Sequence, residues 1–172
     1  MQLSFPHQSI QALQAGHWFK LICGASFQDL PAIRHLTITY TLAGADCIDV
    51  AAEPAVVAAA RSGITAANYL IDAAIQLGYQ PTQPWLMVSV NDGEDPHFRK
   101  AVFDPNICPA DCPRPCASIC PADAIAFTAQ QQGVIVDRCY GCGRCLPICP
   151  IQIIGEQKQI STPAVVRKLL QT

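Results

Sequence analysis

The sequence has little charge, few aromatic residues and no long apolar run. Only 14% of its 172 residues are charged and 7% are aromatic, whereas 51% are hydrophobic. A disordered chain would need far more charge and far fewer aliphatic side chains, so this composition indicates a folded protein with a substantial core. A formal net charge of -2 and an isoelectric point near 6.0 give no electrostatic footprint for nucleic acid or for an anionic membrane surface. We therefore expect no nucleic-acid partner.

Signals for export, membrane insertion and nucleotide binding are also missing. The N-terminus has no basic segment followed by an apolar one, and the apolar runs fall far short of the ~18 residues that a membrane span needs. We therefore expect a cytoplasmic protein without a membrane span. No G-x-G-x-x-G follows a strand-like run, and there is no phosphate-binding loop or Ser-His-Asp elbow. The sequence thus indicates neither a flavin nor a nicotinamide site.

Residues 1–97 alternate strand-like with helix-like stretches. Three nearly continuous apolar runs predict parallel strands covered on both faces: residues 19–24, 47–51 and 85–90. Such a β-α-β segment fits either part of a barrel or an open sheet. It is too short to close an eight-stranded barrel, which takes ~200 residues or more.

Two stretches between these strands predict crossover helices: residues 29–43 and 53–76. Asp29 is expected to cap the first helix and Gly44 to end it, while Pro54 suits the first position of the second. Gly63 and Gly78 are expected to act as stops. The β-branched residues of segment 37–41 favour a strand by propensity, but the apolar spacing and the need for a crossover favour a helix.

Cysteine is concentrated in a second unit, residues 98–158. Eight of the ten cysteines lie between positions 108 and 149. Without an export signal, metal ligation is a better explanation than disulfides. Prolines are frequent in this unit and only residues 124–127 and 134–136 are strand-like, so bound metal is expected to hold it together. Residues 159–172 predict a helix from Thr162-Pro163, which either returns to the first segment or starts a missing region.

The second cysteine run, residues 139–150, reads C-x2-C-x2-C-x3-C-P, the spacing of bacterial ferredoxins. Its short gaps let three thiolates wrap one corner of a cubane, and Gly141 and Gly143 remove side chains that would crowd it. The first run, residues 108–121, has x3 gaps throughout but keeps the terminal C-x3-C-P. This widened loop leaves open whether the first site holds a [4Fe-4S] or a [3Fe-4S] cluster.

In the ferredoxin pattern, the last cysteine of each run ligates the cluster of the other run. We therefore expect two clusters with the ligands Cys108, Cys112, Cys116 and Cys149 for the first, and Cys139, Cys142, Cys145 and Cys120 for the second. Each run continues from Cys-Pro into a short strand-like segment, which is the repeat of a dicluster domain. Zinc and disulfides remain minor alternatives, since zinc sites use paired spacings of four ligands.

For other candidate residues, the sequence gives weaker evidence of a functional role. Cys23 and Cys47 are more readily explained as buried structural thiols than as site residues. The residues Lys20, Asp49 and Glu53 could line a pocket at the ends of the strands, although a core ion pair or a helix cap explains them equally well.

Four further residues lie close to the cysteines in sequence. The charges of Arg114, Arg138 and Arg144 could offset cluster charge, or these residues could be solvated surface residues. His97 could lie near a cluster, although a loop position is the simpler explanation.

Residues 98–158 resemble the bacterial-type two-[4Fe-4S] ferredoxin domain. Together with the β-α-β segment, in particular GHWFKLICGAS at 16–26 and LAGADCIDVAA at 42–52, the order of parts resembles the cyanobacterial light-dependent-period family. The expected fold class is thus α/β, with a parallel β-α-β segment followed by an α+β dicluster ferredoxin-like domain.

This resemblance implies an iron-sulfur redox sensor that relays the photosynthetic or quinone redox state to the circadian clock. The implied partners are a redox donor such as the quinone or ferredoxin pool, a clock input kinase and clock proteins. A sensor of this kind need not be an enzyme. The alternative is an electron-transfer subunit or a fragment of an iron-sulfur (flavo)oxidoreductase.

Overall fold

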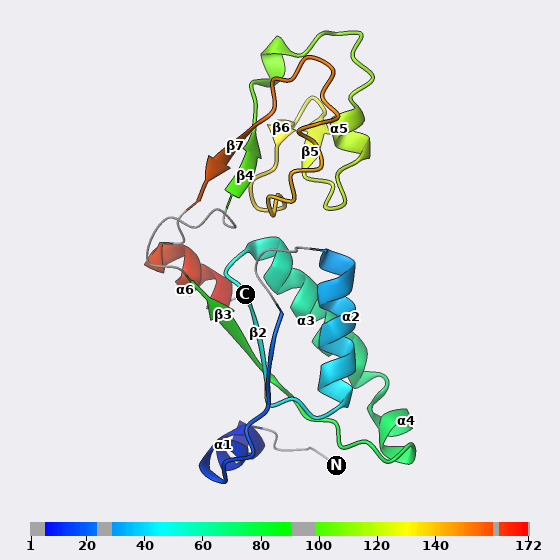
Figure 1. Ribbon diagram of the computed structural model, residues 1–172, viewed down its shortest axis with the longest axis vertical. Coiled ribbons are helices and arrows are strands. Elements are labelled where there is room, and N and C mark those ends of the chain that lie inside the picture. The colour runs from blue at the N-terminus through cyan, green and yellow to red at the C-terminus, as the bar shows by residue number, and fades with distance from the viewer. Residues whose placement is uncertain (1–5, 24–28, 91–98, 160–161, 172) are drawn as a thin grey trace. The chain divides into compact units, whose positions relative to one another are not determined.

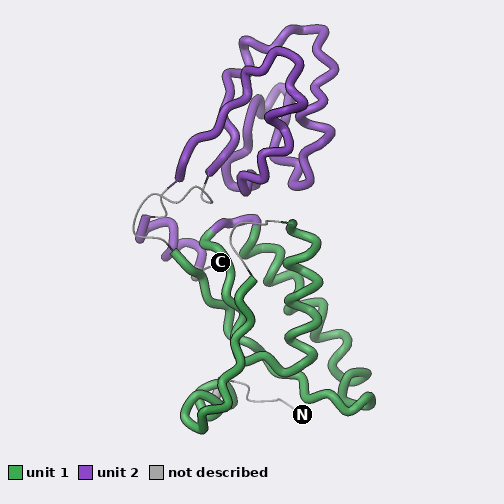
Figure 2. Tube along the Cα trace, in the orientation of Figure 1, with its two compact units in different colours: residues 1–25, 29–52, 56–90 green, residues 26–28, 53–55, 91–172 purple. Residues whose placement is uncertain are grey.

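The structure, a computed structural model, describes residues 6–23, 29–90, 99–159 and 162–171. Its contacts divide the chain into two units (Figure 2). The first comprises residues 1–25, 29–52 and 56–90, and the second comprises residues 26–28, 53–55 and 91–172. The predicted boundary between residues 97 and 98 lies outside the described residues, so the division into 1–97, 98–158 and 159–172 stays a prediction.

The first unit contains a parallel three-stranded sheet in the order β1-β2-β3 (Figure 1). Its elements are α1 (Pro6–Gln14), β1 (Lys20–Ile22), α2 (Leu30–Leu42), β2 (Cys47–Ala51), α3 (Pro54–Asn68), α4 (Ile71–Gln76) and β3 (Trp85–Ser89). The parallel β-α-β segment is therefore confirmed, and β2 begins and ends at the predicted residues. The short helix α1 was not predicted.

Only the central strand is covered on both faces, so the expectation for all three strands was wrong. Every residue of β2 is buried, whereas β3 alternates between exposed and half-buried residues. The strand order explains the difference. Right-handed crossovers that advance in one direction place their helices on the same face, and Figure 1 shows α2 and α3 together on one side of the sheet. The edge strand β3 therefore leaves Trp85 and Met87 partly exposed.

Local signals set the limits of α2. The carboxylate of Asp29 accepts a hydrogen bond from the backbone N–H of Ala32 at 3.3 Å, as an N-cap does. Gly44 follows the helix with a φ of +92°, a conformation that glycine adopts without strain. Segment 37–41 is helical, and Thr37 and Thr41 are buried. The prediction of a helix here, against β propensity, is confirmed.

Gly63 does not end a helix, which corrects the sequence prediction. It lies inside α3, where an added Cβ would come within 2.8 Å of the Arg34 carbonyl oxygen and of Thr37 Cβ. The glycine is needed because α2 and α3 approach closely at this point. The predicted second helix is instead interrupted after Asn68 and resumes as α4, and Gly78 follows α4 with a φ of +88°.

The second unit has two small antiparallel pairs, β4 with β7 and β5 with β6. Its elements are β4 (Arg99–Val102), the 3-10 helix η1 (Pro105–Ile107), α5 (Pro115–Ser118), β5 (Ile125–Phe127), β6 (Gln132–Val134), β7 (Gly155–Lys158) and α6 (Pro163–Gln171). The helix predicted from Pro163 is confirmed. The strand predicted at 134–136 begins two residues earlier, because Val134 and Gly133 pair with β5.

Cysteines make up half of the buried hydrophobic cluster at the core of the second unit. The members of this cluster are Ala101, Cys116, Ala124, Ile125, Cys139, Cys145, Cys149 and Ile154. The aliphatic contribution is small, which agrees with a domain that metal ligation stabilises.

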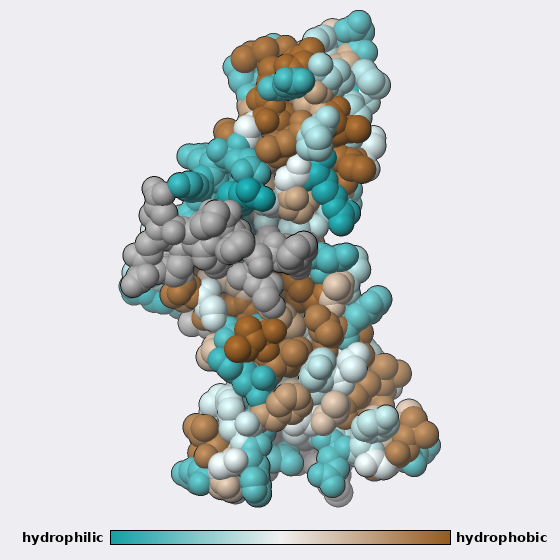
Figure 3. Space-filling model, viewed as in Figure 1, coloured by the Kyte–Doolittle hydropathy of each residue, from teal (hydrophilic) through white to brown (hydrophobic). Residues whose placement is uncertain are grey.

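Exposed apolar side chains gather over α4 and the residues beside it (Figure 3). Leu70, Ile75 and Leu77 are 45%, 54% and 78% exposed. Among the described residues, no helix is both long and apolar enough to cross a membrane.

Candidate metal centre

Four of the cysteines line one cavity of the second unit. They are Cys120, Cys139, Cys142 and Cys145. Three come from the second run, and Cys120 is the last cysteine of the first run. The structure thus brings together the four residues that the crossed ligation pattern predicts for one cluster.

These four thiols also interact electrostatically. Burial, followed by the negative charges of Cys139, Cys142 and Cys120, raises the pKa of the Cys145 thiol to about 11. Thiolates that repel one another in a buried place need cations between them to stay ionised. The donor set therefore fits an iron-sulfur cluster, in which iron ions offset the charge of the thiolates.

The loop that bears Cys139 and Cys142 packs closely against β4. Gly141 has a φ of +75°, and an added Cβ would lie 2.1 Å from the Arg99 carbonyl oxygen. Arg99 also donates from Nε to the Gly141 carbonyl at 3.4 Å and forms an ion pair with Glu156 at 2.9 Å. The close approach of β4 therefore requires glycine at this position, whereas the expected role of Gly141, to keep a side chain clear of a cluster, stays a prediction.

The other four cysteines form a second group. Burial raises the pKa of Cys116, and the nearby charges of Cys149 and Cys112 raise it further. The pKa of Cys108 is raised by burial and by its hydrogen bond and charge interaction with Cys112, with a further contribution from Cys116. Cys149, the last cysteine of the second run, therefore lies near the first run, as crossed ligation requires.

Backbone N–H groups surround the sulfur of Cys149. Burial alone would raise the pKa of this thiol, but hydrogen bonds from the backbone of the following turn outweigh that effect and lower it; they come from Ile153, Ile151, Ile154 and Gln152. Donors arranged in this way stabilise a thiolate. The lowered pKa favours the thiolate form of Cys149, which is the form that ligates iron.

Three further cysteine sulfurs accept backbone hydrogen bonds. Ala101 donates to Cys139 at 3.4 Å, Arg114 to Cys112 at 3.4 Å and Ala124 to Cys120 at 3.3 Å. Both groups of cysteines contain such bonds. Hydrogen bonds to ligand sulfurs are among the features that set the potential of an iron-sulfur cluster.

The widened first run is accommodated by ordinary turns. The backbone N–H of Cys112 donates to the Pro109 carbonyl at 3.1 Å, which closes the first x3 gap. Arg114 has a φ of +53° and precedes α5, which carries Cys116. The guanidinium carbon of Arg114 lies 4.2 Å from the centre of the Phe127 ring, which fixes this turn against β5.

Among the described residues, no three acidic, histidine or cysteine side chains are placed to hold one metal ion.

The remaining sequence candidates are mostly structural. Lys20 pairs with Asp49 at 3.0 Å, and Ser89 donates to the other oxygen of Asp49 at 2.7 Å, so these residues form an ion-pair cluster on the sheet. Burial raises the pKa of both Cys23 and Cys47, with Asp49 adding to the effect. This agrees with buried neutral thiols.

The other candidates, which lie close to the cysteines in sequence, differ in their surroundings. Arg144 lines the cavity of the second cysteine group, whereas Arg138 donates to the Asp123 carbonyl at 3.4 Å. His97 lies outside the described residues.

The partner of Glu53 is a residue that no sequence pattern indicates. Glu53 belongs to the second unit and forms a buried ion pair with Lys100, whose ammonium also donates to the carbonyl of Cys139. Burial raises the pKa of Glu53, and the hydrogen bond and charge of Lys100 oppose that effect. The two residues are 47 positions apart, so no local pattern connects them.

Comparisons with known proteins identify an iron-sulfur domain over the residues that contain both cysteine runs. Residues 108–160 match the family described as LdpA Fe-S cluster-binding domain. Over 171 residues the chain is 58% identical to Light dependent period A of Synechococcus elongatus, an alignment that covers 99% of this chain and 44% of the relative. The chain thus spans less than half the length of that relative. No solved structure matches the chain. The resemblance to the light-dependent-period family is confirmed, and the chain carries the iron-sulfur cluster-binding domain of the LdpA family.

Proposed function

We propose that the second unit is a dicluster ferredoxin-like domain that holds two [4Fe-4S] clusters by crossed ligation. Cys108, Cys112, Cys116 and Cys149 hold the first cluster, and Cys139, Cys142, Cys145 and Cys120 hold the second. The observation that carries the proposal is the grouping of the cysteines. Each group combines three members of one run with the last member of the other.

The chain's own residues suit clusters that exchange electrons and bind no substrate. A cluster with four thiolate ligands has no open coordination position, and when bound it supplies one-electron chemistry. Backbone N–H groups donate to the sulfurs in both groups and stabilise the added negative charge of the reduced state. The small aliphatic core makes the fold of the unit depend on the clusters.

We further propose that the clusters sense redox state in a light-dependent process that sets a period. Similarity to Light dependent period A supports this proposal. Electrons would come from a donor such as the quinone or ferredoxin pool, and the response would pass to a clock input kinase and clock proteins. A change in cluster charge or integrity would alter the surface of the second unit and thereby its affinity for a partner protein.

An anaerobic redox titration followed by electron paramagnetic resonance tests the sensing proposal. The full chain is titrated with mediators while each cluster signal is measured against potential. Midpoints within the range of the quinone pool support a sensor. Midpoints far below any quinone would contradict sensing of that pool and would favour low-potential electron transfer, the function of an oxidoreductase subunit.

A further inference from the structure

Lys100 is buried in the second unit together with its acidic partner. The side chains of Lys100 and Glu53 are each only 6% exposed. In two other ion pairs, by contrast, Lys20 is 29% exposed and Arg99 is 39% exposed. Removing two charges from water costs several kcal/mol per ion, and their attraction often fails to repay this cost. Stability alone is therefore a poor explanation for this pair.

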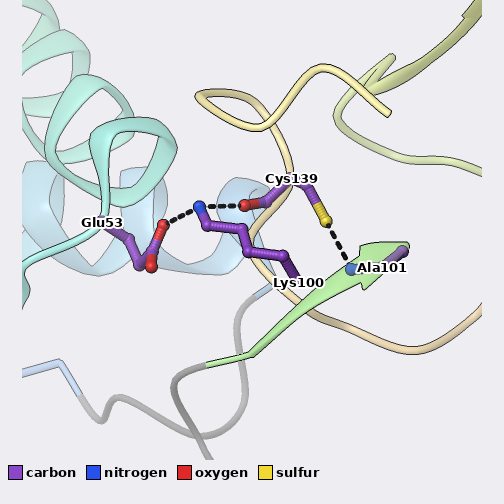
Figure 4. Close-up of polar contacts among 4 residues, drawn as sticks. All are labelled: Glu53, Lys100, Ala101 and Cys139. Atoms are coloured by element: carbon purple, nitrogen blue, oxygen red, sulfur yellow. Dashed lines mark hydrogen bonds and ion pairs between the residues drawn. The ribbon is translucent and has the colours of Figure 1, made fainter. Parts of the chain in front are cut away.

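Both Lys100 and its neighbour Ala101 contact Cys139 (Figure 4). The Lys100 ammonium donates to the Cys139 carbonyl at 2.5 Å, and the N–H of Ala101 donates to the Cys139 sulfur at 3.4 Å. On its other side, the ammonium contacts the Glu53 carboxylate. Two consecutive residues of β4 thus hold the backbone and the sulfur of one cysteine, and a buried positive charge lies beside it.

A positive charge in this position has a predictable effect on a cluster. A cubane with four thiolates is an anion, and reduction adds one more negative charge. A fixed cation nearby stabilises the reduced state, and an anion opposes it. Both effects are stronger in a buried environment than in water, because the effective dielectric constant is lower.

We propose that Lys100 raises the reduction potential of the cluster that Cys139 helps to hold, and that Glu53 positions the ammonium and moderates its effect. Both act as positioning and charge-supplying residues and ligate no iron. The proposal rests on the ligation proposed above. The redox step is the gain of one electron by the cluster, which a chemical reductant such as dithionite supplies in the test, and no bond to Lys100 or Glu53 is made or broken.

The test is an anaerobic redox titration of the full chain, with iron counted in every variant. Lys100→Met is expected to shift one midpoint to lower potential and leave the other nearly unchanged. Glu53→Gln is expected to shift the same midpoint to higher potential, and the double variant is expected to lie between the two. Lys100→Arg keeps the charge and should restore the midpoint. Lys168→Met removes the same charge from an exposed position on α6 and should shift neither midpoint.

Opposite shifts at one cluster would support the inference, because a merely structural role predicts no dependence on the sign of the charge removed. If Lys100→Met and Glu53→Gln keep their iron and both midpoints stay in place, the inference is overturned while the ligation proposal stands. If Lys100→Met loses iron, the midpoint potential of Glu53→Gln becomes the test. An upward shift of this midpoint supports the inference, and an unchanged midpoint overturns it. Absence of iron from the unmodified protein would instead overturn the ligation proposal itself.

Discussion

Asp123 and Gln152 occupy equivalent positions in the two halves of the cluster-binding domain. Each is the third residue after the last cysteine of its run, and their φ angles are +47° and +53°. The N–H of Asp123 donates to the Cys120 carbonyl at 3.3 Å, and that of Gln152 donates to the Cys149 carbonyl at 3.1 Å. The Cys-Pro repeat in the sequence is therefore also a repeat of backbone conformation.

A β-branched residue at Gln152 should disturb the turn around Cys149. Valine disfavours a positive φ by ~1–2 kcal/mol, and the N–H groups of residues 151–154 would shift away from the Cys149 sulfur. We expect Gln152→Val to lower the temperature at which the visible cluster absorption is lost, and Gln152→Gly to leave it nearly unchanged. The control is Gln157→Val, at an exposed position on β7. Equal behaviour of the two valine variants would contradict this account.

Gly141→Ala should prevent binding of the cluster at Cys139. The added Cβ would lie 2.1 Å from the Arg99 carbonyl oxygen. Because this oxygen belongs to the backbone of β4, the clash can be relieved only if the strand or the loop moves. Gly143→Ala is a matched control, because its φ of +72° is similar but its nearest contact is the end of the Glu156 side chain at 3.6 Å. The iron content of Gly141→Ala should fall to that of one cluster, while Gly143→Ala should keep nearly all its iron. Full iron content in Gly141→Ala would refute the close approach.

Gly63→Ala should destabilise the first unit although alanine favours helices. Overpacking typically costs ~1–3 kcal/mol, which exceeds the ~1 kcal/mol gained in helix propensity. Both tryptophans, Trp18 and Trp85, lie in the first unit, so urea unfolding followed by tryptophan fluorescence reports on this unit. Thr65→Ala, at an exposed position of the same helix, should not lower the midpoint. A higher urea midpoint for Gly63→Ala would contradict the packing argument.

Thiol labelling should separate the ten cysteines into two classes. Cys23 and Cys47 are 3% and 2% exposed, and burial raises the pKa of both thiols, so they stay neutral and unreactive at pH 8. In the iron-loaded protein we expect little modification by iodoacetamide at any cysteine. Removal of iron with a chelator under anaerobic conditions should expose the cysteines of both runs.

Mass spectrometry of the labelled peptides identifies the sites. Modification of Cys108 in iron-loaded protein, at the same rate as after iron removal, would show that this residue is not a ligand. That result would make the widened first run an atypical site.

The central elements of the fold could be predicted because their signals are local. The apolar run of β2 and the cap at Asp29 are recognisable within a few residues of sequence. Gly63 was misread because a glycine that permits close helix packing and a glycine that ends a helix look alike in sequence. Strands β4 and β7 were missed because RKAV and GEQK carry no apolar alternation. They are defined by their pairing with each other.

In the candidate site, too, features with a local sequence signal could be predicted, and contacts between distant residues could not. Spacing alone made the eight cysteines candidate ligands, because the loops of a cubane site restrict how many residues separate its ligands. Lys100 could not be predicted in this way. Its contacts to Glu53 and Cys139 join positions separated by 47 and 39 residues, and they exist only once the chain has folded.

The most direct test of the central claim is a count of iron and acid-labile sulfide per chain in protein purified without oxygen. Two [4Fe-4S] clusters require about eight irons and about eight sulfides per chain. We predict that result, with magnetic interaction between the two reduced clusters. About four irons per chain would contradict the account, because one of the two cysteine groups would then hold no cluster of its own.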